Sequence, residues 1–124
     1  MLDREFEIRE PREQFRIDRE LYARQIDYLF QRSAFYRRKL GEAGFQDRRS
    51  VGTLEDISNL PFTEKDELRT TQADHPPFGD HLACEPEDLV RIYSTSGTTG
   101  VPCFLGVTQH DLEMYATNVA RGYT

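Results

Sequence analysis

A short stretch of glycine, serine and threonine lies between two apolar runs, and this arrangement constrains the chain more than any other feature. The apolar runs cover residues 89–93 and 103–107 and are dense in β-branched and aromatic residues. Runs of this kind, bounded by glycine and proline, are typical of β-strands. We therefore expect the stretch between them to be a loop that two rigid elements hold in place.

The loop has the composition of an anion-binding site. Gly97 and Gly100 lack a Cβ atom, so the backbone there can approach a ligand closely. Successive backbone N–H groups of such a loop can converge on an anion, and neighbouring hydroxyl groups can donate to phosphate oxygens. The hydroxyl residues of the loop are Thr95, Ser96, Thr98 and Thr99. The pattern favours a site for a polyphosphate.

Two common phosphate motifs do not fit this loop. Val101 and Pro102 follow Gly100, so the lysine and the immediate helix of the P-loop are missing. The Gly-x-Gly-x-x-Gly pattern of dinucleotide-binding proteins does not occur in the chain either. A polar hairpin turn is the simpler alternative, because glycine, serine and threonine are ordinary turn residues.

The loop and its surroundings resemble a known family. Residues 95–100 together with Pro102 resemble the phosphate-binding signature of adenylate-forming enzymes. The wider pattern is similar to one branch of that superfamily, the phenylacetate-coenzyme A ligases. The similar stretches are residues 33–37, 60–65, 89–92, 106–108, 111–112 and 120–121. They follow one another in unbroken order over roughly residues 20–124, which is far more specific than the loop alone.

The resemblance implies an AMP-forming coenzyme A ligase as the intact protein. In that family an aryl carboxylate attacks the α-phosphorus of Mg-ATP, pyrophosphate leaves, and coenzyme A thiolate then displaces AMP from the acyl-adenylate. The implied cofactor is ATP with Mg, and coenzyme A is the co-substrate. The loop would hold the β- and γ-phosphates, through Thr95, Ser96, Gly97, Thr98, Thr99 and Gly100. Thr95 stands where this branch more usually has serine and keeps a hydroxyl.

The same resemblance implies that most of the site lies elsewhere. The adenine-binding segment, the ribose-binding aspartate, the aryl pocket and the mobile lysine of the family should follow residue 124. We therefore expect no catalytic residue and no metal ligand in this chain, and no ligase activity from it alone. Two alternatives stay open. The chain can be a non-catalytic phosphate-binding or assembly module completed by a partner, or part of a related ligase that adenylates a different acid or a deazaflavin cofactor.

Charge and composition limit the other function classes. The net charge is −6, but residues 1–49 carry 12 basic against 10 acidic residues while residues 50–124 carry 4 against 12. Residues 37–39 can belong to a basic patch for RNA or a phosphorylated cofactor, although interspersed acids favour a solvated face. Basic residues do not alternate with stacking aromatics, so we expect no nucleic-acid partner.

The sequence shows no pattern typical of membrane targeting, secretion or redox chemistry. No apolar run is long enough for a membrane span, and the charged first residues do not form a signal peptide. Cys84 and Cys103 have no C-x-x-C partner, and the histidines do not show zinc spacing. We expect reduced, structural cysteines and a cytoplasmic protein.

The expected fold class is α/β. Residues 1–72 should form a mainly helical subdomain, and residues 73–88 should form a connecting segment. Residues 89–124 should form a strand, the loop, a second strand and a helix, which open a large N-terminal adenylation domain. Helical spacing of apolar residues covers residues 14–31. The expected N-caps of the later helices are Ser33, Thr63 and Thr108. Residues 53–57 should form a short helical turn with a capping residue ahead of it. Lys65 should lie on a solvated face.

A two-stranded sheet of this kind is incomplete. Unpaired strand edges and apolar faces are unfavourable in water. We expect the remainder of the protein's own chain or a second copy to cover them, and in their absence self-association or substantial disorder.

Overall fold

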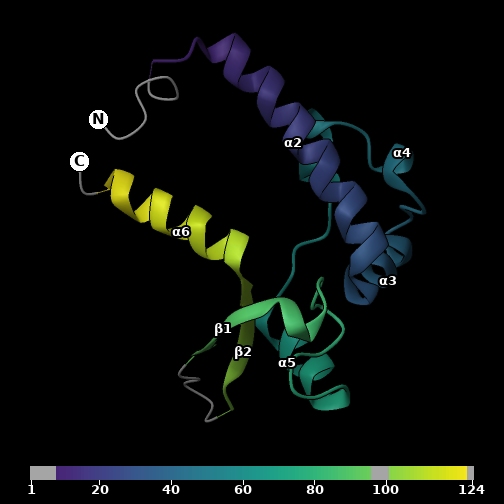
Figure 1. The fold of residues 1–124 in the computed structure, drawn as a ribbon. Coiled ribbons are helices and arrows are strands. Elements are labelled where there is room, and N and C mark those ends of the chain that lie inside the picture. Colours follow the sequence, from purple (N-terminus) through teal and green to yellow (C-terminus); the bar gives the residue numbers. More distant parts are fainter. Residues whose placement is uncertain (1–7, 96–100, 123–124) are drawn as a thin grey trace.

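The computed structural model describes residues 8–95 and 101–122. Most of these residues are helical, and two strands form a small antiparallel sheet, as expected for an α/β piece (Figure 1). The α-helices are α2 (Pro11–Arg32), α3 (Ala34–Glu42), α4 (Arg48–Val51), α5 (Lys65–Asp74) and α6 (Gln109–Gly122). The 3-10 helices are η1 (Leu54–Asn59) and η2 (Pro86–Asp88), and the strands are β1 (Leu89–Thr95) and β2 (Cys103–Thr108).

The N-terminal helices form around a small apolar core. α2 begins at Pro11, where a missing N–H costs no helical hydrogen bond. The hydroxyl of Ser33 accepts a hydrogen bond from the backbone N–H of Tyr36 and starts α3, which confirms the predicted cap. The buried apolar residues are Ile26, Phe35, Leu40, Val51 and Cys103. Four of these five lie in α2, α3 and α4, so the core belongs mainly to the helices.

One predicted cap is wrong. α5 begins after Glu64 rather than after Thr63. The reason is a carboxylate three residues into the turn: the backbone N–H of Glu64 donates to Oε2 of Glu67 at 2.7 Å, which fixes the helix start one residue later.

The cap predicted at Thr108 is confirmed, and the short turn predicted at residues 53–57 is the 3-10 helix η1, which begins after Thr53. Asp56 accepts from the backbone N–H of Thr53 and starts η1. Asp111 accepts from the backbone N–H of Thr108 at 2.9 Å and starts α6. The short helix α4 has its own capping box and was not expected from the sequence.

The two strands lie where the apolar runs predict them. They pair antiparallel, with Thr95 opposite Cys103 at the loop end and Leu89 opposite Thr108 at the other end. An irregularity between Leu89 and Arg91 shifts the register near the start of β1. Described residues add no third strand to the sheet, so the expectation of a small, incomplete sheet is confirmed for this part of the chain.

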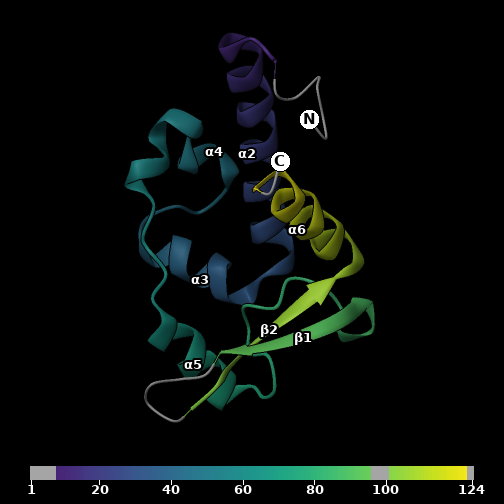
Figure 2. The same ribbon diagram turned by 90° about the vertical axis from the view of Figure 1, so that its left-hand side faces the viewer.

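α6 is the least covered of the α-helices. In Figures 1 and 2 it continues from the end of β2 and reaches away from the hairpin. None of its residues is buried, and Tyr115 keeps 63% of its surface exposed. Within residues 8–95 and 101–122, none of the helices combines the length and the apolar character that crossing a membrane requires.

Candidate functional site

The hairpin brings the two ends of the predicted loop together. Thr95 closes β1 and Cys103 opens β2, and the Thr95 hydroxyl accepts a hydrogen bond from the Cys103 backbone N–H at 3.3 Å. Residues 101 and 102 lead into β2 with exposed side chains. Ser96, Gly97, Thr98, Thr99 and Gly100 lie outside the described residues. Of the six predicted site residues, Thr95 is therefore the one whose contacts are described.

A buried glutamine of α5 holds β2 from the side opposite β1. The Gln72 side chain donates to the Phe104 carbonyl at 2.6 Å and accepts from the Phe104 N–H at 3.0 Å. Only 8% of the surface of Gln72 is exposed. A primary amide has both a donor and an acceptor, so this one side chain satisfies both backbone groups of Phe104. Gln72 was not among the predicted site residues, because a glutamine near a helix end carries no distinguishing pattern in the sequence.

The end of α5 is shaped by a tight turn. Gly79 has a φ of +74°, which is a left-handed conformation. A Cβ atom at this position would lie 2.8 Å from the backbone nitrogen of Gln72 and 2.8 Å from two atoms of Thr71. The absence of a side chain therefore lets the turn after α5 fold back onto its last residues. The Asp80 backbone N–H then donates to the Thr71 hydroxyl at 2.8 Å.

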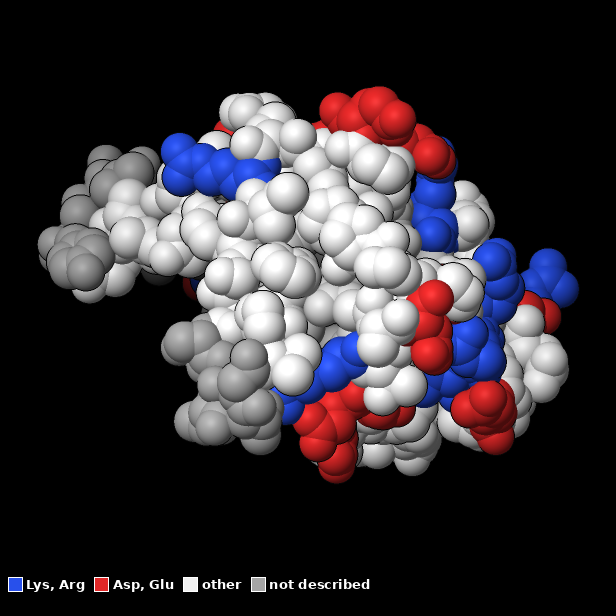
Figure 3. Space-filling view, turned by 90° about the horizontal axis from the view of Figure 1, so that it is seen from below, with Lys and Arg blue, Asp and Glu red and all other residues white. Residues whose placement is uncertain are grey.

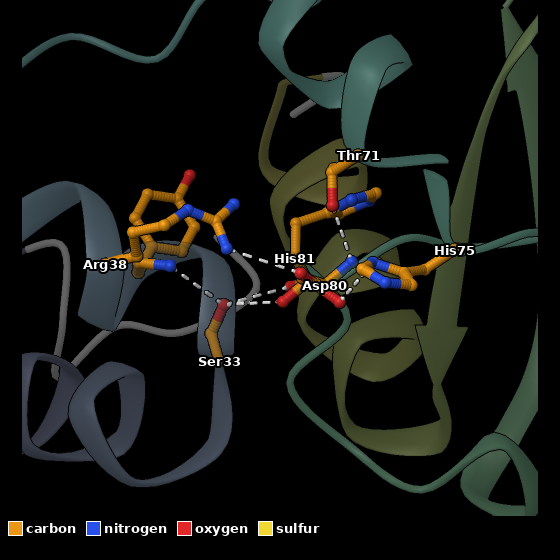
Figure 4. A network of polar contacts seen from close by, with 7 residues as sticks. Ser33, Arg38, Thr71, His75, Asp80 and His81 are labelled. Carbon is orange, nitrogen blue, oxygen red and sulfur yellow. Dashed lines mark hydrogen bonds and ion pairs between the residues drawn. The ribbon is translucent and has the colours of Figure 1, made fainter. Parts of the chain in front are cut away.

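Asp80 connects this turn to the N-terminal helices, as Figure 4 shows. Its carbonyl accepts from the Phe35 N–H at 3.0 Å and from the Ser33 hydroxyl at 3.3 Å. Its carboxylate contacts His75 at 2.9 Å and Arg38 at 3.4 Å. The strand pair is therefore tied to α3 through a continuous set of hydrogen bonds.

His81 is the residue next to this junction. Burial lowers the pKa of His81, although the Asp80 carboxylate and the Phe104 backbone act in the opposite direction. A lowered pKa favours the neutral imidazole at pH 7. Its Nδ1 atom is buried without a hydrogen-bond partner among the described residues. His81 is therefore poorly suited to binding an anion by charge.

A cleft of about 820 Å³ separates α2 from the hairpin. Its walls include Tyr28, His81, Cys84, His110 and Asp111. Burial, followed by the nearby carboxylate of Asp88, raises the pKa of the Cys84 thiol. A thiol with a raised pKa is a poor nucleophile at neutral pH. This agrees with the structural role expected for Cys84.

The described residues also form no cluster of three or more histidine, cysteine, aspartate or glutamate side chains that could hold a metal ion. No magnesium ligand is assigned among them.

Several basic residues of the N-terminal half form ion pairs with acidic residues. Arg38 contacts Asp80, Lys39 contacts Glu67, and Arg48 contacts Asp27. Figure 3 shows blue and red side chains interspersed, with a broad area of neither charge between them. Lys65 is exposed, as expected for a solvated face.

Curated proteins named phenylacetate-coenzyme A ligase match the chain closely. The protein from Thermus thermophilus is 43% identical over 112 residues, which are 90% of this chain and 24% of the relative. Over nine tenths of its length this chain is thus similar to a phenylacetate-coenzyme A ligase. Relatives from Pseudomonas putida and Escherichia coli are 35% and 38% identical over 96 residues, 77% of this chain and 20% and 21% of those relatives. The resemblance seen in the sequence is thereby confirmed.

Solved structures of coenzyme A ligases match the fold as well. A crystal structure of 2-hydroxyisobutyryl-CoA ligase in complex with 2-HIB-AMP and CoA has a TM-score of 0.74 and 35% identity, covering 82% of this chain and 21% of that one. The same ligase in the postadenylation state has a TM-score of 0.64 and 36% identity, covering 72% and 18%. The match lies in the N-terminal part of these enzymes. No family model matches the chain.

The chain therefore spans about a quarter or less of the length of the relatives that it matches. The matched quarter contains the hairpin and the helices that support it. The family relationship thus rests on this supporting structure and on the loop sequence between the strands.

Proposed function

We propose that this chain supplies the nucleotide phosphate-binding hairpin of an ATP-dependent, AMP-forming coenzyme A ligase. In the proposed role Thr95, Ser96, Gly97, Thr98, Thr99 and Gly100 hold the β- and γ-phosphates while an acid is converted to its acyl-adenylate. The observation that carries the proposal is a hydroxyl-rich and glycine-rich loop sequence, closed at its base by Thr95 and Cys103, in a region that matches ligases crystallised with an acyl-AMP.

The chemistry of Thr95 supports this role. Its oxygen accepts from the Cys103 N–H, and the hydroxyl hydrogen stays available for a phosphate oxygen. Residues 92–108 carry no lysine, arginine or histidine. Binding would therefore depend on backbone N–H groups and hydroxyls rather than on positive side chains. Magnesium would arrive with the triphosphate, since the described residues offer no ligand cluster.

The acid is proposed as an aryl carboxylate of the phenylacetate type, because the curated relatives carry that name. A second candidate is a small hydroxy acid, which the name of the matched solved ligase favours. Coenzyme A would be the acceptor in either case. Selectivity residues for the acid are expected outside this chain.

The phosphate role is tested by a titration of the isotopically labelled chain. Amide resonances of Gly97 and Gly100 are followed by NMR while tripolyphosphate, ATP or AMP is added at constant magnesium. Tripolyphosphate and ATP should shift these resonances, and AMP should not, because it lacks the β- and γ-phosphates. The double variant Ser96→Ala/Thr98→Val should weaken the effect, while Ser94→Ala on β1 should not. Equal shifts with AMP, or none with tripolyphosphate, would contradict the proposal.

Ligase activity is a separate measurement. Phenylacetate or 2-hydroxyisobutyrate is incubated with ATP, coenzyme A and the 124-residue chain, and AMP and the thioester are quantified. We expect no product from these residues alone, since none of them matches the adenine, ribose or lysine elements of the family. Robust thioester formation would refute the prediction that the chain is inactive alone.

A further inference from the structure

We propose that Gln72 is a positioning residue, which closes the outer edge of β2 and thereby holds Thr95 opposite Cys103. This inference rests on the proposed function, because Thr95 is the described member of the phosphate site. Gln72 itself lies on α5 and belongs to neither strand. Its two bonds to Phe104, at 2.6 and 3.0 Å, are the observation that carries the proposal.

The bonds of Gln72 are those that a neighbouring strand would make. Opposed residues in an antiparallel pair alternate between exchanging both backbone hydrogen bonds and exchanging none. Phe104 lies opposite Ser94 in the strand pair. Its backbone N–H and carbonyl both form hydrogen bonds with the Gln72 side chain. Phe104 and Ser94 are therefore a non-hydrogen-bonded pair, and Gln72 takes the place of a third strand at this point.

This placement holds β2 against α5 next to the loop. The two bonds keep the backbone of Phe104 at the end of α5, and an unpaired buried amide would be costly if β2 moved away. Cys103 precedes Phe104 directly and lies opposite Thr95. Gln72 therefore helps to hold this pair at the base of the loop.

Gln72 lies at the anchored end of α5. The preceding residue, Thr71, accepts from the Asp80 N–H at 2.8 Å, and the Asp80 carbonyl accepts from the Phe35 N–H of α3. The side chain that holds β2 thus belongs to an element that is tied to the N-terminal helices.

Wild-type protein provides a test without any substitution. The Phe104 N–H faces away from β1, and on an open strand edge it would exchange with solvent rapidly. Bonded to Gln72, it should exchange about as slowly as the N–H groups that pair β2 with β1. Hydrogen exchange measured by NMR gives the answer, and fast exchange at Phe104 would overturn the proposal.

The second test compares two adjacent buried residues of α5. Gln72→Met keeps the volume and removes both bonds to Phe104, whereas the matched control Thr71→Val removes one bond to Asp80 and leaves β2 untouched. Unfolding stability, the Thr95 and Cys103 amide shifts, and tripolyphosphate affinity are measured for both. For Gln72→Met we expect shifted hairpin resonances and a dissociation constant raised about tenfold, the equivalent of one or two hydrogen bonds. For Thr71→Val we expect lower stability with an unchanged dissociation constant.

The outcomes separate the two claims. If wild-type protein does not bind tripolyphosphate, the proposed function fails, and the role of Gln72 in it fails as well. If the wild type binds and both variants bind equally well, the positioning role alone is overturned. If both variants lose affinity in proportion to stability, Gln72 has only a structural role and the proposal is also overturned.

Discussion

The hydroxyl of Ser33 donates a hydrogen bond to the backbone carbonyl of Asp80, 47 residues further along the chain. The same hydroxyl oxygen accepts from the N–H of Tyr36 and caps α3. Ser33 is fully buried. One small side chain therefore starts a helix and also fastens the segment that leads to the hairpin.

Removal of this hydroxyl should destabilise the fold. We expect Ser33→Ala to lower the free energy of unfolding by about 1–2 kcal/mol, because a helix cap and a buried hydrogen bond are both lost. Ser50→Ala is the matched control, since Ser50 takes part in an exposed capping box of the four-residue helix α4. Chemical denaturation measures both, and an equal or larger loss for Ser50→Ala would contradict the prediction.

The turn at Gly79 allows a test of close packing. Gly79 and Gly44 both have positive φ angles, but only at Gly79 does a Cβ atom meet neighbours within 4 Å. Gly44→Ala should cost about 1 kcal/mol through backbone strain alone. Gly79→Ala should cost more and should also shift the Phe104 amide resonance, since it pushes against Gln72. Thermal unfolding and NMR compare the two, and equal effects would show that packing at Gly79 is unimportant.

The ion pair between Arg19 and Glu55 predicts part of the acid sensitivity. The Arg19 side chain, followed by the Thr53 hydroxyl, lowers the pKa of Glu55 to about 2. A carboxylate with a lowered folded-state pKa stabilises the protein at pH values above about 4.5 and loses this effect as the pH falls toward about 2. With Glu55→Gln, the free energy of unfolding should therefore fall less steeply as the pH is lowered between these two values.

Because the pair is exposed, its contribution is screened by solvent, and the flattening should be small. Arg19→Gln should give the same flattening, and the double variant should add nothing further. Urea denaturation at a series of pH values measures this. Additive effects of the two substitutions would show that the residues act independently.

The outer edge of β1 predicts self-association. Val90, Ile92 and Tyr93 are exposed on this strand, with 58% of the Ile92 surface accessible, and no described strand pairs with its outer edge. Exposed apolar edges favour association. Sedimentation velocity should show oligomers that increase with concentration, or else a poorly ordered chain.

The substitution that tests this edge is Ile92→Lys, which should shift the chain toward monomer. Ile57→Lys is the control, because Ile57 is similarly exposed on η1, which is not part of the sheet. A compact and monodisperse wild-type monomer would contradict the prediction.

Local features of this chain were predictable from its residues. The strands at residues 89–95 and 103–108 follow from apolar runs, and the cap at Thr108 follows from a hydroxyl with an acid three residues later. Each signal involves residues only a few positions apart. The start of α5 was missed by one residue, because two candidate caps stood side by side and the Glu67 carboxylate decided between them.

The sequence by itself determined most of the helices, the two strands, the family resemblance and the composition of the candidate phosphate loop, because these depend on neighbouring residues and on a collinear pattern. Only the tertiary structure decided that Gln72 closes β2 at Phe104 and that Ser33 holds Asp80. Those pairs lie 32 and 47 residues apart. Their partners are chosen by how α5, the turn at Gly79 and the hairpin pack together, and hydrophobic periodicity along the chain carries no information about that choice.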